Sequence, residues 1–409
     1  MTFSKFDFDP RVSAGVAALG FVEATPIQQQ SIPPILEGRD VMGLAQTGTG
    51  KTAAFVLPIL QRLLKSPRSG LRALIIAPTR ELAEQIHEAI GALSRRTGIR
   101  SVTIYGGVAM GPQVQKLRQG AAIAVACPGR LLDHIEQRTV DLSRLEVIVL
   151  DEADRMFDMG FLPPIRAIFR HVPSKRQTLL FSATMPDDIR RLTSEILRDP
   201  VTVEIGHSTP VATVSHAILP IEPHLKSALL LELLKRTETE SVLIFTRTKH
   251  RAKRLGRQLQ SAGHPATSLH GDLSQSQRQA ALRGFRDGKF RILAATDIAA
   301  RGIDVSHISH VINYDMPDTT DAYTHRIGRT GRATRTGDAY TLVTREDHGM
   351  VREIERVLGT KLERRRFDKF DYATPVPKPQ PTSINAARTQ RAGSPRPSAA
   401  RHQRARSAW

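Results

Sequence analysis

The run from Ala45 to Thr52, Ala-Gln-Thr-Gly-Thr-Gly-Lys-Thr, has the residue types and spacing of a phosphate-binding loop. Its glycines allow backbone N–H groups to wrap around phosphate oxygens, Lys51 can reach β- and γ-phosphates, and the Thr52 hydroxyl can hold Mg²⁺. A glycine-rich turn between a strand and a helix is the simpler alternative. The apolar run that follows, Ala53-Ala-Phe-Val-Leu, predicts the helix that a phosphate loop requires. The predicted loop residues are Ala45, Gln46, Thr47, Gly48, Thr49, Gly50, Lys51 and Thr52.

An acidic group, Asp151-Glu152-Ala153-Asp154, follows the apolar run Val147–Leu150. Parallel sheets bind ligands at the carboxyl ends of their strands, so these carboxylates should lie beside the phosphate loop. Asp151 would then hold the Mg²⁺, and Glu152 would polarise the attacking water. Taken alone, the four residues could equally begin a helix, where acidic side chains interact favourably with the helix dipole. The phosphate loop upstream favours the catalytic interpretation.

The elements that must position these residues are short apolar runs alternating with helical stretches, which is typical of parallel α/β sheets. The strands expected in the first half after Val41 are Ala73–Ala77, Val102–Tyr105, Ile123–Ala126, Val147–Leu150 and Thr178–Phe181. Turn-forming residues between Gly206 and Ser215 interrupt the pattern. The strands expected after this break are Val242–Phe245, Ala266–Leu269, Ile292–Ala295, Val311–Asn313 and Tyr340–Val343.

The sequence therefore predicts an α/β protein with two domains, residues 1–207 and 217–365, joined by a linker at 208–216. The second series of strands is expected to begin at Val242–Phe245, and Thr246-Arg-Thr-Lys-His follows it where a phosphate loop would stand. Because only the first domain carries such a loop, we expect one nucleotide site in the cleft between the two domains.

Length and charge support this organisation. A chain of 409 residues exceeds what one hydrophobic core usually supports. The 59 Lys and Arg residues outnumber the 40 acidic residues, for a net charge of +19. Such a balance indicates an anionic partner, nucleic acid before membrane, although a solvated basic surface is the alternative. The single cysteine, Cys127, excludes an internal disulfide framework and a cysteine-rich zinc site.

The C-terminal tail, residues 366–409, is basic and poor in apolar residues. Residues 361–409 hold twelve Lys and Arg against three acidic residues, and no acidic residue follows Asp371. We expect residues 374–409 to be disordered, because little there can be buried to offset the ordering entropy. The tail is predicted to anchor nucleic acid electrostatically, so its deletion should flatten the salt dependence of nucleic-acid binding. A solubilising or partner-binding tail is the alternative.

Several further motifs occur together with the phosphate loop and the acidic tetrad in the order typical of one family. The motifs of the first half are Thr25-Pro-Ile-Gln28 after Gly20-Phe21, Pro78-Thr-Arg-Glu-Leu-Ala83, Gly106-Gly107, Pro128-Gly-Arg130 and Ser182-Ala-Thr184. Those of the second half are Ile244-Phe-Thr-Arg-Thr248, His270-Gly-Asp272, Ala295–Asp304 and His325-Arg-Ile-Gly-Arg-Thr-Gly-Arg332. Over residues 1–360 the chain resembles the DEAD-box RNA helicases, and the residues of its motifs are most similar to those of the bacterial RhlE-type branch.

The resemblance implies two tandem RecA-like domains and assigns roles to individual residues. Phe3 and Gln28 are implied to recognise adenine, and Asp304 to contact the ribose. Arg329 and Arg332 are implied to be arginine fingers, and His325 to couple the domains. Ser182, Ala183 and Thr184 are implied to link the nucleotide state to strand separation. The implied RNA-contacting residues are Pro78, Thr79, Arg80, Gly106, Gly107, Gly129, Arg130, Arg247 and Thr296. The family usually has Thr where this chain has Cys127, which weakens the expectation of a hydroxyl contact there.

These assignments imply an ATP-dependent, Mg²⁺-dependent RNA helicase that unwinds RNA duplexes locally and non-processively or remodels RNA–protein complexes. ATP and RNA should bind with positive coupling, since each would favour closure of the two domains. Ribosome-assembly intermediates and an RNA-decay complex are the candidate assemblies. We expect a cytoplasmic monomer without a membrane anchor, because no apolar run is long enough to span a bilayer and no signal peptide is evident. A nuclear location is the alternative.

Two other function classes remain open from the sequence. A DNA translocase would share the phosphate loop and acidic motif but would not need Gln28 with Phe3, nor Ser182-Ala-Thr184 beside this tetrad. A non-enzymatic RNA chaperone would work through the basic tail, and its activity would survive Lys51→Ala and Glu152→Gln.

Overall fold

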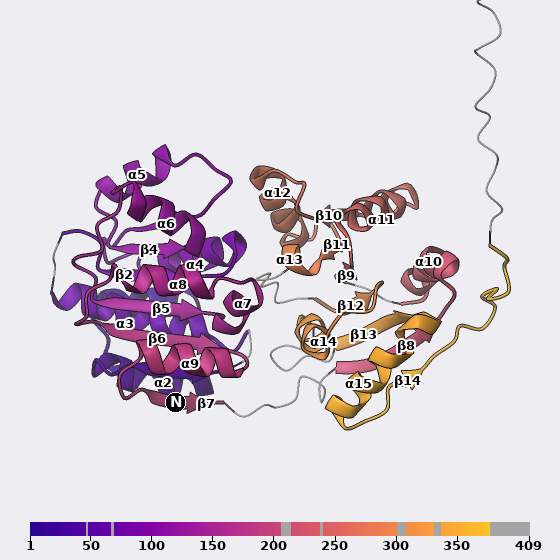
Figure 1. Ribbon diagram of the computed structural model, residues 1–409, viewed down its shortest axis with the longest axis horizontal. Helices are drawn as coiled ribbons and strands as arrows, with labels where there is room; N and C mark the ends of the chain where they lie inside the picture. The colour runs from indigo at the N-terminus through magenta and orange to yellow at the C-terminus, as the bar shows by residue number, and fades with distance from the viewer. Residues whose placement is uncertain are drawn as a thin grey trace, which may run out of the picture. The chain divides into compact units, whose positions relative to one another are not determined.

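The structure is a computed structural model that describes residues 1–45, 48–66, 69–205, 214–237, 240–300, 308–330 and 337–376 (Figure 1). The chain divides into one unit from Met1 to Phe370 and a second from Asp371 to Trp409. Most of the predicted linker and tail lies outside the described residues, and the domain boundaries stay predictions. Within the described ranges, no helix combines the length and the apolar character needed to cross a bilayer.

The first sheet contains seven strands among the described residues, in the order β3-β4-β2-β5-β6-β1-β7, and all neighbouring strands are parallel. The strands are β1 (Val41–Leu44), β2 (Ala73–Ile76), β3 (Ser101–Ile104), β4 (Ile123–Ala126), β5 (Val147–Asp151), β6 (Gln177–Ser182) and β7 (Val201–Glu204). The expected parallel α/β architecture is confirmed, and all five strands predicted after Val41 form. β7 was not predicted, because it is a half-exposed edge strand without a continuous apolar run.

Alternating side chains of these strands enter two hydrophobic layers, one on each face of the sheet. In β2, Ile75 belongs to one layer, and Leu74 and Ile76 belong to the other, as the two-residue strand period requires. Helices α2, α3 and α4 cover one face, and α8 and α9 cover the other (Figure 1). The helices of this half are α1 (Pro10–Ala18), α2 (Pro26–Leu36), α3 (Lys51–Lys65), α4 (Arg80–Leu93), α5 (Gly111–Arg118), α6 (Pro128–Glu136), α7 (Ala153–Asp158), α8 (Leu162–Phe169) and α9 (Asp187–Ile196).

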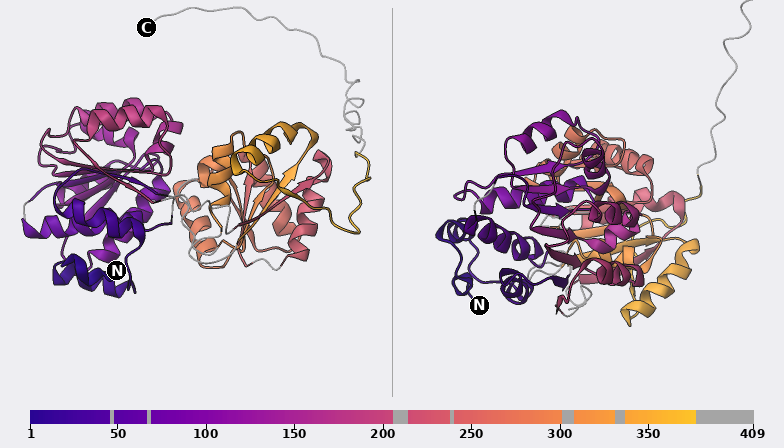
Figure 2. Two further views of the ribbon diagram at one scale, coloured as in Figure 1. Left: turned by 90° about the horizontal axis from the view of Figure 1, so that it is seen from below. Right: turned by 60° about the vertical axis from the view of Figure 1, so that its left-hand side comes forward.

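The second sheet is also parallel and contains seven strands in the described part of the chain, in the order β10-β11-β9-β12-β13-β8-β14. The strands are β8 (Val214–Pro220), β9 (Val242–Thr246), β10 (Ala266–Leu269), β11 (Ile292–Thr296), β12 (His310–Asn313), β13 (Gly337–Val343) and β14 (Glu363–Arg364). The helices are α10 (Lys226–Arg236), α11 (Lys249–Ser261), α12 (Gln275–Arg286), α13 (Asp297–Ala300), α14 (Thr320–Ile327) and α15 (His348–Leu358). Figure 2 shows each sheet with its covering helices from two further directions.

The two sheets have the same strand order, so each strand of the first sheet has a counterpart seven places later in the chain. β8 is therefore the counterpart of β1, and β9 is the counterpart of β2. The prediction that the second series begins at Val242 is wrong, because β8 precedes it. The true counterpart of the phosphate loop is residues 221–225, between β8 and α10, and not the turn after β9.

Hydroxyl side chains begin several of the helices that follow these strands. Thr79 accepts the Leu82 N–H at the start of α4, and Thr248 accepts the Arg251 N–H at the start of α11. Such caps satisfy backbone donors that a helix leaves free in its first turn. They fix the strand-to-helix turns, where most of the predicted site residues lie.

Candidate functional site

The phosphate loop ends in a backbone conformation that requires glycine. Gly50 has φ +93°, and a Cβ on it would lie 2.5 Å from Nε2 of Gln28. Lys51 is the first residue of α3, is buried, and donates from Nζ to the Ala45 carbonyl oxygen at 2.9 Å. The lysine thus folds back across the loop, toward the place where the loop and the helix N-terminus favour phosphate. The loop residues that lie outside the described part are Gln46 and Thr47.

A cavity of about 270 Å³ lies beside this loop. It brings together the predicted phosphate, metal and water-activating groups, because Lys51, Thr52, Asp151 and Glu152 all line it. Arg329 also lines it. The remaining lining residues are Leu19, Phe21, Gln28, Gly48, Gly50, Ala53, Leu82, Gln85, Ala89 and Leu93.

Gln28 ties helix α2 to the phosphate loop. Its Oε1 accepts the Thr25 N–H at 2.9 Å, and its Nε2 donates to the Gly50 carbonyl oxygen at 3.1 Å. Phe21, which is 40% exposed, lines the cavity. Phe3 is buried and stacks on Phe21, with ring centroids 6.1 Å apart. Phe3 is thus placed behind Phe21 and does not line the cavity.

The acidic tetrad begins at the carboxyl end of β5, as predicted. Burial raises the pKa of Asp151 to about 6, although the positive charge of Lys51 opposes the shift. Glu152 has φ +56°, an uncommon left-handed conformation for a residue with a side chain. Its Oε2 accepts a hydrogen bond from Nη1 of Arg155 at 2.9 Å, and both side chains are almost fully buried. Arg155 therefore holds the carboxylate that would activate water.

Asp154 connects the tetrad to residues 182–184. Its Oδ2 accepts the N–H of Ala183 at 3.1 Å, and the N–H and hydroxyl of Thr184 at 2.9 and 3.1 Å. The Asp154 N–H donates to Oγ of Ser182, which itself donates to the Thr184 carbonyl oxygen. Burial alone would raise the pKa of Asp154, but Lys51 and other positive neighbours outweigh it and lower the pKa. The three predicted coupling residues thus contact Asp154.

The predicted RNA-contacting residues of the first half gather where the adjacent strands β3, β4 and β2 end. Arg80 packs against Gly107, whose φ is +75° and whose Cβ would lie 2.3 Å from the guanidinium. Arg130 donates to the Val108 carbonyl oxygen at 3.0 Å, so both arginines lie beside Gly106 and Gly107. The other residues of this group lie at the starts of α4 and α6: Pro78, Thr79 and Gly129.

Cys127 stands at the N-cap of α6, and its side chain makes no capping hydrogen bond. Burial raises the pKa of its thiol to about 12, so it stays protonated at neutral pH. The usual threonine would offer a hydroxyl at this position, which this chain lacks.

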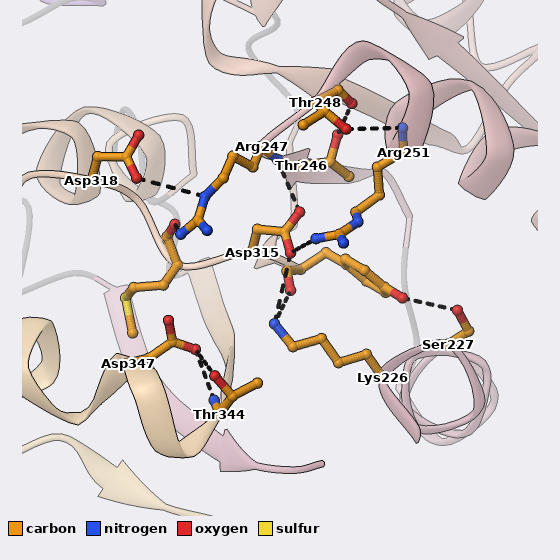
Figure 3. Close-up of polar contacts among 12 residues, drawn as sticks. Lys226, Ser227, Thr246, Arg247, Thr248, Arg251, Asp315, Asp318, Thr344 and Asp347 are labelled. Atoms are coloured by element: carbon orange, nitrogen blue, oxygen red, sulfur yellow. Dashed lines mark hydrogen bonds and ion pairs between the residues drawn. The ribbon is translucent and has the colours of Figure 1, made fainter. Parts of the chain in front are cut away.

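In the second half, Thr296 ends β11 and pairs with Thr246 at the end of the neighbouring strand β9. Arg247 follows directly, and its backbone N–H donates to Oδ2 of Asp315 at 2.9 Å (Figure 3). Its guanidinium lies 3.6 Å from Oδ1 of Asp318 and 3.4 Å from the Met316 carbonyl oxygen. The structure thus brings the two predicted RNA-contacting residues of this half to adjacent strand ends.

Between His325 and Arg329, the three basic side chains lie in different surroundings. Arg326 forms a bidentate pair with Asp297, both N–O distances being 2.6 Å, and donates to the Asp315 carbonyl oxygen. His325 has its pKa lowered to about 4 by burial and by Arg155, so it is neutral at physiological pH. Arg329 is buried and lines the cavity described above. The predicted site residues of the second half that lie outside the described part are Asp304 and Arg332.

The sequence does not predict four residues that the structure places at the site or behind it: Phe21, Asp154, Arg155 and, behind Arg247, Asp315. Phe21 and Asp154 belong to the motifs Gly20-Phe21 and Asp151–Asp154, so their position in these motifs could have indicated them. Arg155 and Asp315 contact other protein groups, and these contacts cannot be predicted from the spacing of the motifs. Within the described ranges, no group of three or more His, Cys, Asp or Glu side chains could hold a metal ion by itself.

Comparisons with known proteins place both halves of the chain in helicase families. A family model described as DEAD/DEAH box helicase matches residues 25–192, and one described as helicase conserved C-terminal domain matches residues 225–334. The ATP-dependent RNA helicase CshA of Listeria monocytogenes is 43% identical over 372 residues, covering 91% of this chain and 71% of that protein. CshA of Bacillus subtilis is 42% identical over 375 residues, covering 91% and 76%.

Among solved structures, S. cerevisiae Dbp5 bound to RNA and ADP BeF3 superposes with a TM-score of 0.81. It is 32% identical, and the match covers 89% of this chain and 95% of Dbp5. The bacterial relatives carry the name CshA, which corrects the expectation of an RhlE-type branch. The tandem RecA-like architecture is confirmed.

Proposed function

The chain belongs to the DEAD-box ATP-dependent RNA helicases, and we propose that it drives local, non-processive unwinding of RNA duplexes or remodelling of RNA–protein complexes. The observation that carries the proposal is the single cavity lined by Lys51, Thr52, Asp151, Glu152 and Arg329. A phosphate-binding lysine, two carboxylates and an arginine in one cavity suit phosphoryl transfer to water.

In the proposed site, the loop amides and Lys51 bind the β- and γ-phosphates, and Gln28 and Phe21 lie at the adenine end. The Thr52 hydroxyl and the Asp151 carboxylate are hard oxygen donors in the same cavity, which suits a hydrated Mg²⁺. When bound, Mg²⁺ would neutralise phosphate charge. Its affinity should depend on ionised Asp151, whose pKa is raised.

Glu152, held by Arg155, orients a water molecule toward the γ-phosphorus. The water oxygen forms a bond to phosphorus while the bond to the bridging oxygen of ADP breaks, and the water proton passes to the Glu152 carboxylate. Arg329 and Arg332 stabilise the charge that develops on the phosphoryl oxygens. Such an arginine contributes about 10³–10⁵ in rate in related phosphoryl-transfer enzymes. Asp304 contacts the ribose.

RNA is proposed to lie along the strand ends that carry Arg80, Arg130 and Arg247. These side chains and nearby backbone groups suit phosphate and sugar contacts, which position RNA without reading its sequence. The support is the convergence of Arg80 and Arg130 on Gly106–Gly107, together with the RNA-bound form of the Dbp5 relative. Ser182, Ala183 and Thr184 would transmit the nucleotide state through Asp154.

The setting of this activity is also a proposal. We propose a cytoplasmic enzyme that acts as a monomer on ribosome-assembly intermediates or in an RNA-decay complex, with the basic tail as an RNA anchor. The support is the net charge of +19 and the relationship to bacterial CshA proteins.

Steady-state ATP hydrolysis with structured RNA, with duplex DNA and without nucleic acid tests the proposed function. RNA alone should stimulate turnover strongly, and Glu152→Gln should abolish it. Equal stimulation by duplex DNA would support a DNA translocase instead, and annealing activity that survives Lys51→Ala would support a chaperone.

A further inference from the structure

The second sheet contains a lysine and an acidic residue at the places that Lys51 and the acidic tetrad occupy in the first. Lys226 is the first residue of α10, which follows β8, the counterpart of β1. Asp315 follows β12, the counterpart of β5. Nζ of Lys226 lies 3.7 Å from Oδ1 of Asp315, so the two groups form a buried ion pair.

This counterpart of the nucleotide site is not built to receive phosphate. The connecting residues 221–225, Ile-Glu-Pro-His-Leu, contain no glycine, and Pro223 has no N–H to offer. Lys226 is buried, and its Nζ donates to the Tyr314 carbonyl oxygen at 3.0 Å. The lysine is therefore bonded to protein groups and is not available to a phosphate.

The Asp315 carboxylate is the centre of a dense set of contacts (Figure 3). Its side chain is 4% exposed, and it accepts hydrogen bonds from Nη1 of Arg251 and from the backbone N–H of Arg247. These partners come from three elements, since Lys226 begins α10, Arg251 lies on α11 and Arg247 follows β9. A buried carboxylate with two cationic neighbours is held in one orientation.

The contact that matters for function is the one to Arg247. Arg247 and Thr248 form the short turn between β9 and α11, and Thr248 caps α11 at the Arg251 N–H. Asp315 thus fixes the turn at its first N–H, while Arg251 fixes it from the other side through the same carboxylate. Within the described ranges, Oδ2 of Asp315 is the one acceptor of the Arg247 N–H.

We infer that Asp315, oriented by Lys226 and Arg251, is a positioning residue that presents Arg247 to RNA, and that the second domain has converted its phosphate-site counterpart to this use. The inference rests on the proposed RNA contact of Arg247. Asp315 itself does not touch RNA or nucleotide. Its effect should therefore appear in RNA affinity and not in the ATP-binding steps.

Asp315→Asn is the first variant. Its single remaining oxygen should turn to the two cations, Lys226 and Arg251, which leaves the amide nitrogen facing the Arg247 N–H, donor against donor. The RNA concentration for half-maximal ATPase stimulation should rise about five- to twentyfold. The KM for ATP and the RNA-free turnover should change less than about twofold. The control is Asp338→Asn, an acidic residue of the same sheet that pairs with His310.

A double-mutant cycle separates positioning from general damage. If Asp315 acts through Arg247, Asp315→Asn should weaken RNA binding by less than about twofold in an Arg247→Ala background. Each single variant should also reduce the magnitude of the slope of log affinity against log salt by about 0.7, the value for one lost phosphate contact on a single strand.

Additive losses in the cycle would overturn the inference and leave the proposed helicase function intact. No loss in Arg247→Ala alone would overturn the RNA contact of Arg247, and the inference with it. RNA-dependent ATPase activity of the wild-type chain reports on the proposed function independently of both results.

Amide hydrogen exchange, measured without RNA, tests directly whether Asp315 holds the Arg247 turn. Lys226→Met/Asp315→Leu replaces both members of the buried pair with apolar residues, so that no buried lysine charge is left unpaired. Hydrogen exchange of the Arg247 amide should be at least about tenfold faster in this variant and in Asp315→Asn than in the wild-type chain. Unchanged exchange at Arg247 would show that Asp315 does not hold the turn.

Discussion

The carboxylate of Asp154 accepts two hydrogen bonds from Thr184, one from its backbone N–H at 2.9 Å and one from its hydroxyl at 3.1 Å. The last acidic residue of the tetrad is thus joined to the end of β6, while Asp151 and Glu152 line the cavity. Neighbouring residues of one motif therefore face different partners: Asp151 and Glu152 line the cavity, and Asp154 contacts residues 182–184.

Thr184→Val removes the hydroxyl and keeps the side-chain shape and the backbone N–H. Unwinding should fall about tenfold while RNA-stimulated ATP hydrolysis stays within about threefold, because a hydrogen bond to a charged group contributes about 1.5–3 kcal/mol. Strand-displacement and ATPase assays on the same preparation measure the two activities. Thr193→Val, which loses a hydroxyl bond inside α9, is the control. Parallel loss of both activities would contradict a coupling role.

Arg155→Met tests how Glu152 is held. Removing one partner of a buried ion pair leaves the other unpaired, at a cost of about 3–5 kcal/mol in stability. We expect kcat to fall about ten- to hundredfold with little change in the KM for ATP, since Glu152 acts on water and not on nucleotide binding. Arg166→Met breaks an exposed pair with Glu195 and should leave kcat unchanged. A rise in KM at constant kcat would assign Arg155 to nucleotide binding instead.

Asp151 should lower the stability of the folded chain at neutral pH. Its pKa rises from 3.8 to about 6 on folding, so between these values the folded state binds more protons than the unfolded state and stability falls as pH rises. Asp151→Asn should therefore be more stable than the wild type by about 3 kcal/mol at pH 7, and the two should converge as the pH falls below 3.8. Urea unfolding followed by circular dichroism at each pH gives the comparison.

The control for this pH series has the opposite sign. A hydrogen bond with Ser143 lowers the pKa of Asp141, so Asp141→Asn should be less stable than the wild type at pH 7. Its deficit should disappear as the pH falls below the ordinary aspartate range. A stability gain for Asp151→Asn that does not depend on pH would rule out the ionisation argument.

Gly50→Ala tests the close approach between the phosphate loop and Gln28. A left-handed backbone costs a residue with a Cβ about 1–2 kcal/mol, and this Cβ would also displace Gln28 Nε2. Binding of a fluorescent ATP analogue should weaken by more than about tenfold. Gly120→Ala carries the same backbone strain, with φ +86°, but no crowded neighbour and no part in the site. Equal nucleotide affinity in the two variants would refute the steric argument.

The sequence predicts the nucleotide half of the site well because two strong local patterns meet at one edge of a parallel sheet. The glycine run and the acidic run each follow an apolar strand, and parallel strands bring their carboxyl ends together. Lys51, Thr52, Asp151 and Glu152 consequently line one cavity, as expected. The predicted roles of these residues still await measurement.

The sequence is less informative where a residue acts on another protein group. The adenine contact of Phe3 stays a prediction; what the sequence does not reveal is that its buried ring stacks on Phe21, which lines the cavity. Asp315 has no neighbouring signature at all, because its partners Lys226, Arg247 and Arg251 are distant in sequence or lie on different elements. β8 escaped prediction because it begins at Val214, at the end of the stretch of turn formers.

The two sheets have the same strand order but different residues at the corresponding turns. The turn after β1 carries the glycines that admit a phosphate, whereas residues 221–225 contain no glycine and lead into a lysine that is fixed to Asp315. One arrangement of strands thus leaves an open anion site in one half of the chain and a closed ion pair in the other. The two halves can therefore take on different tasks without any difference in their architecture.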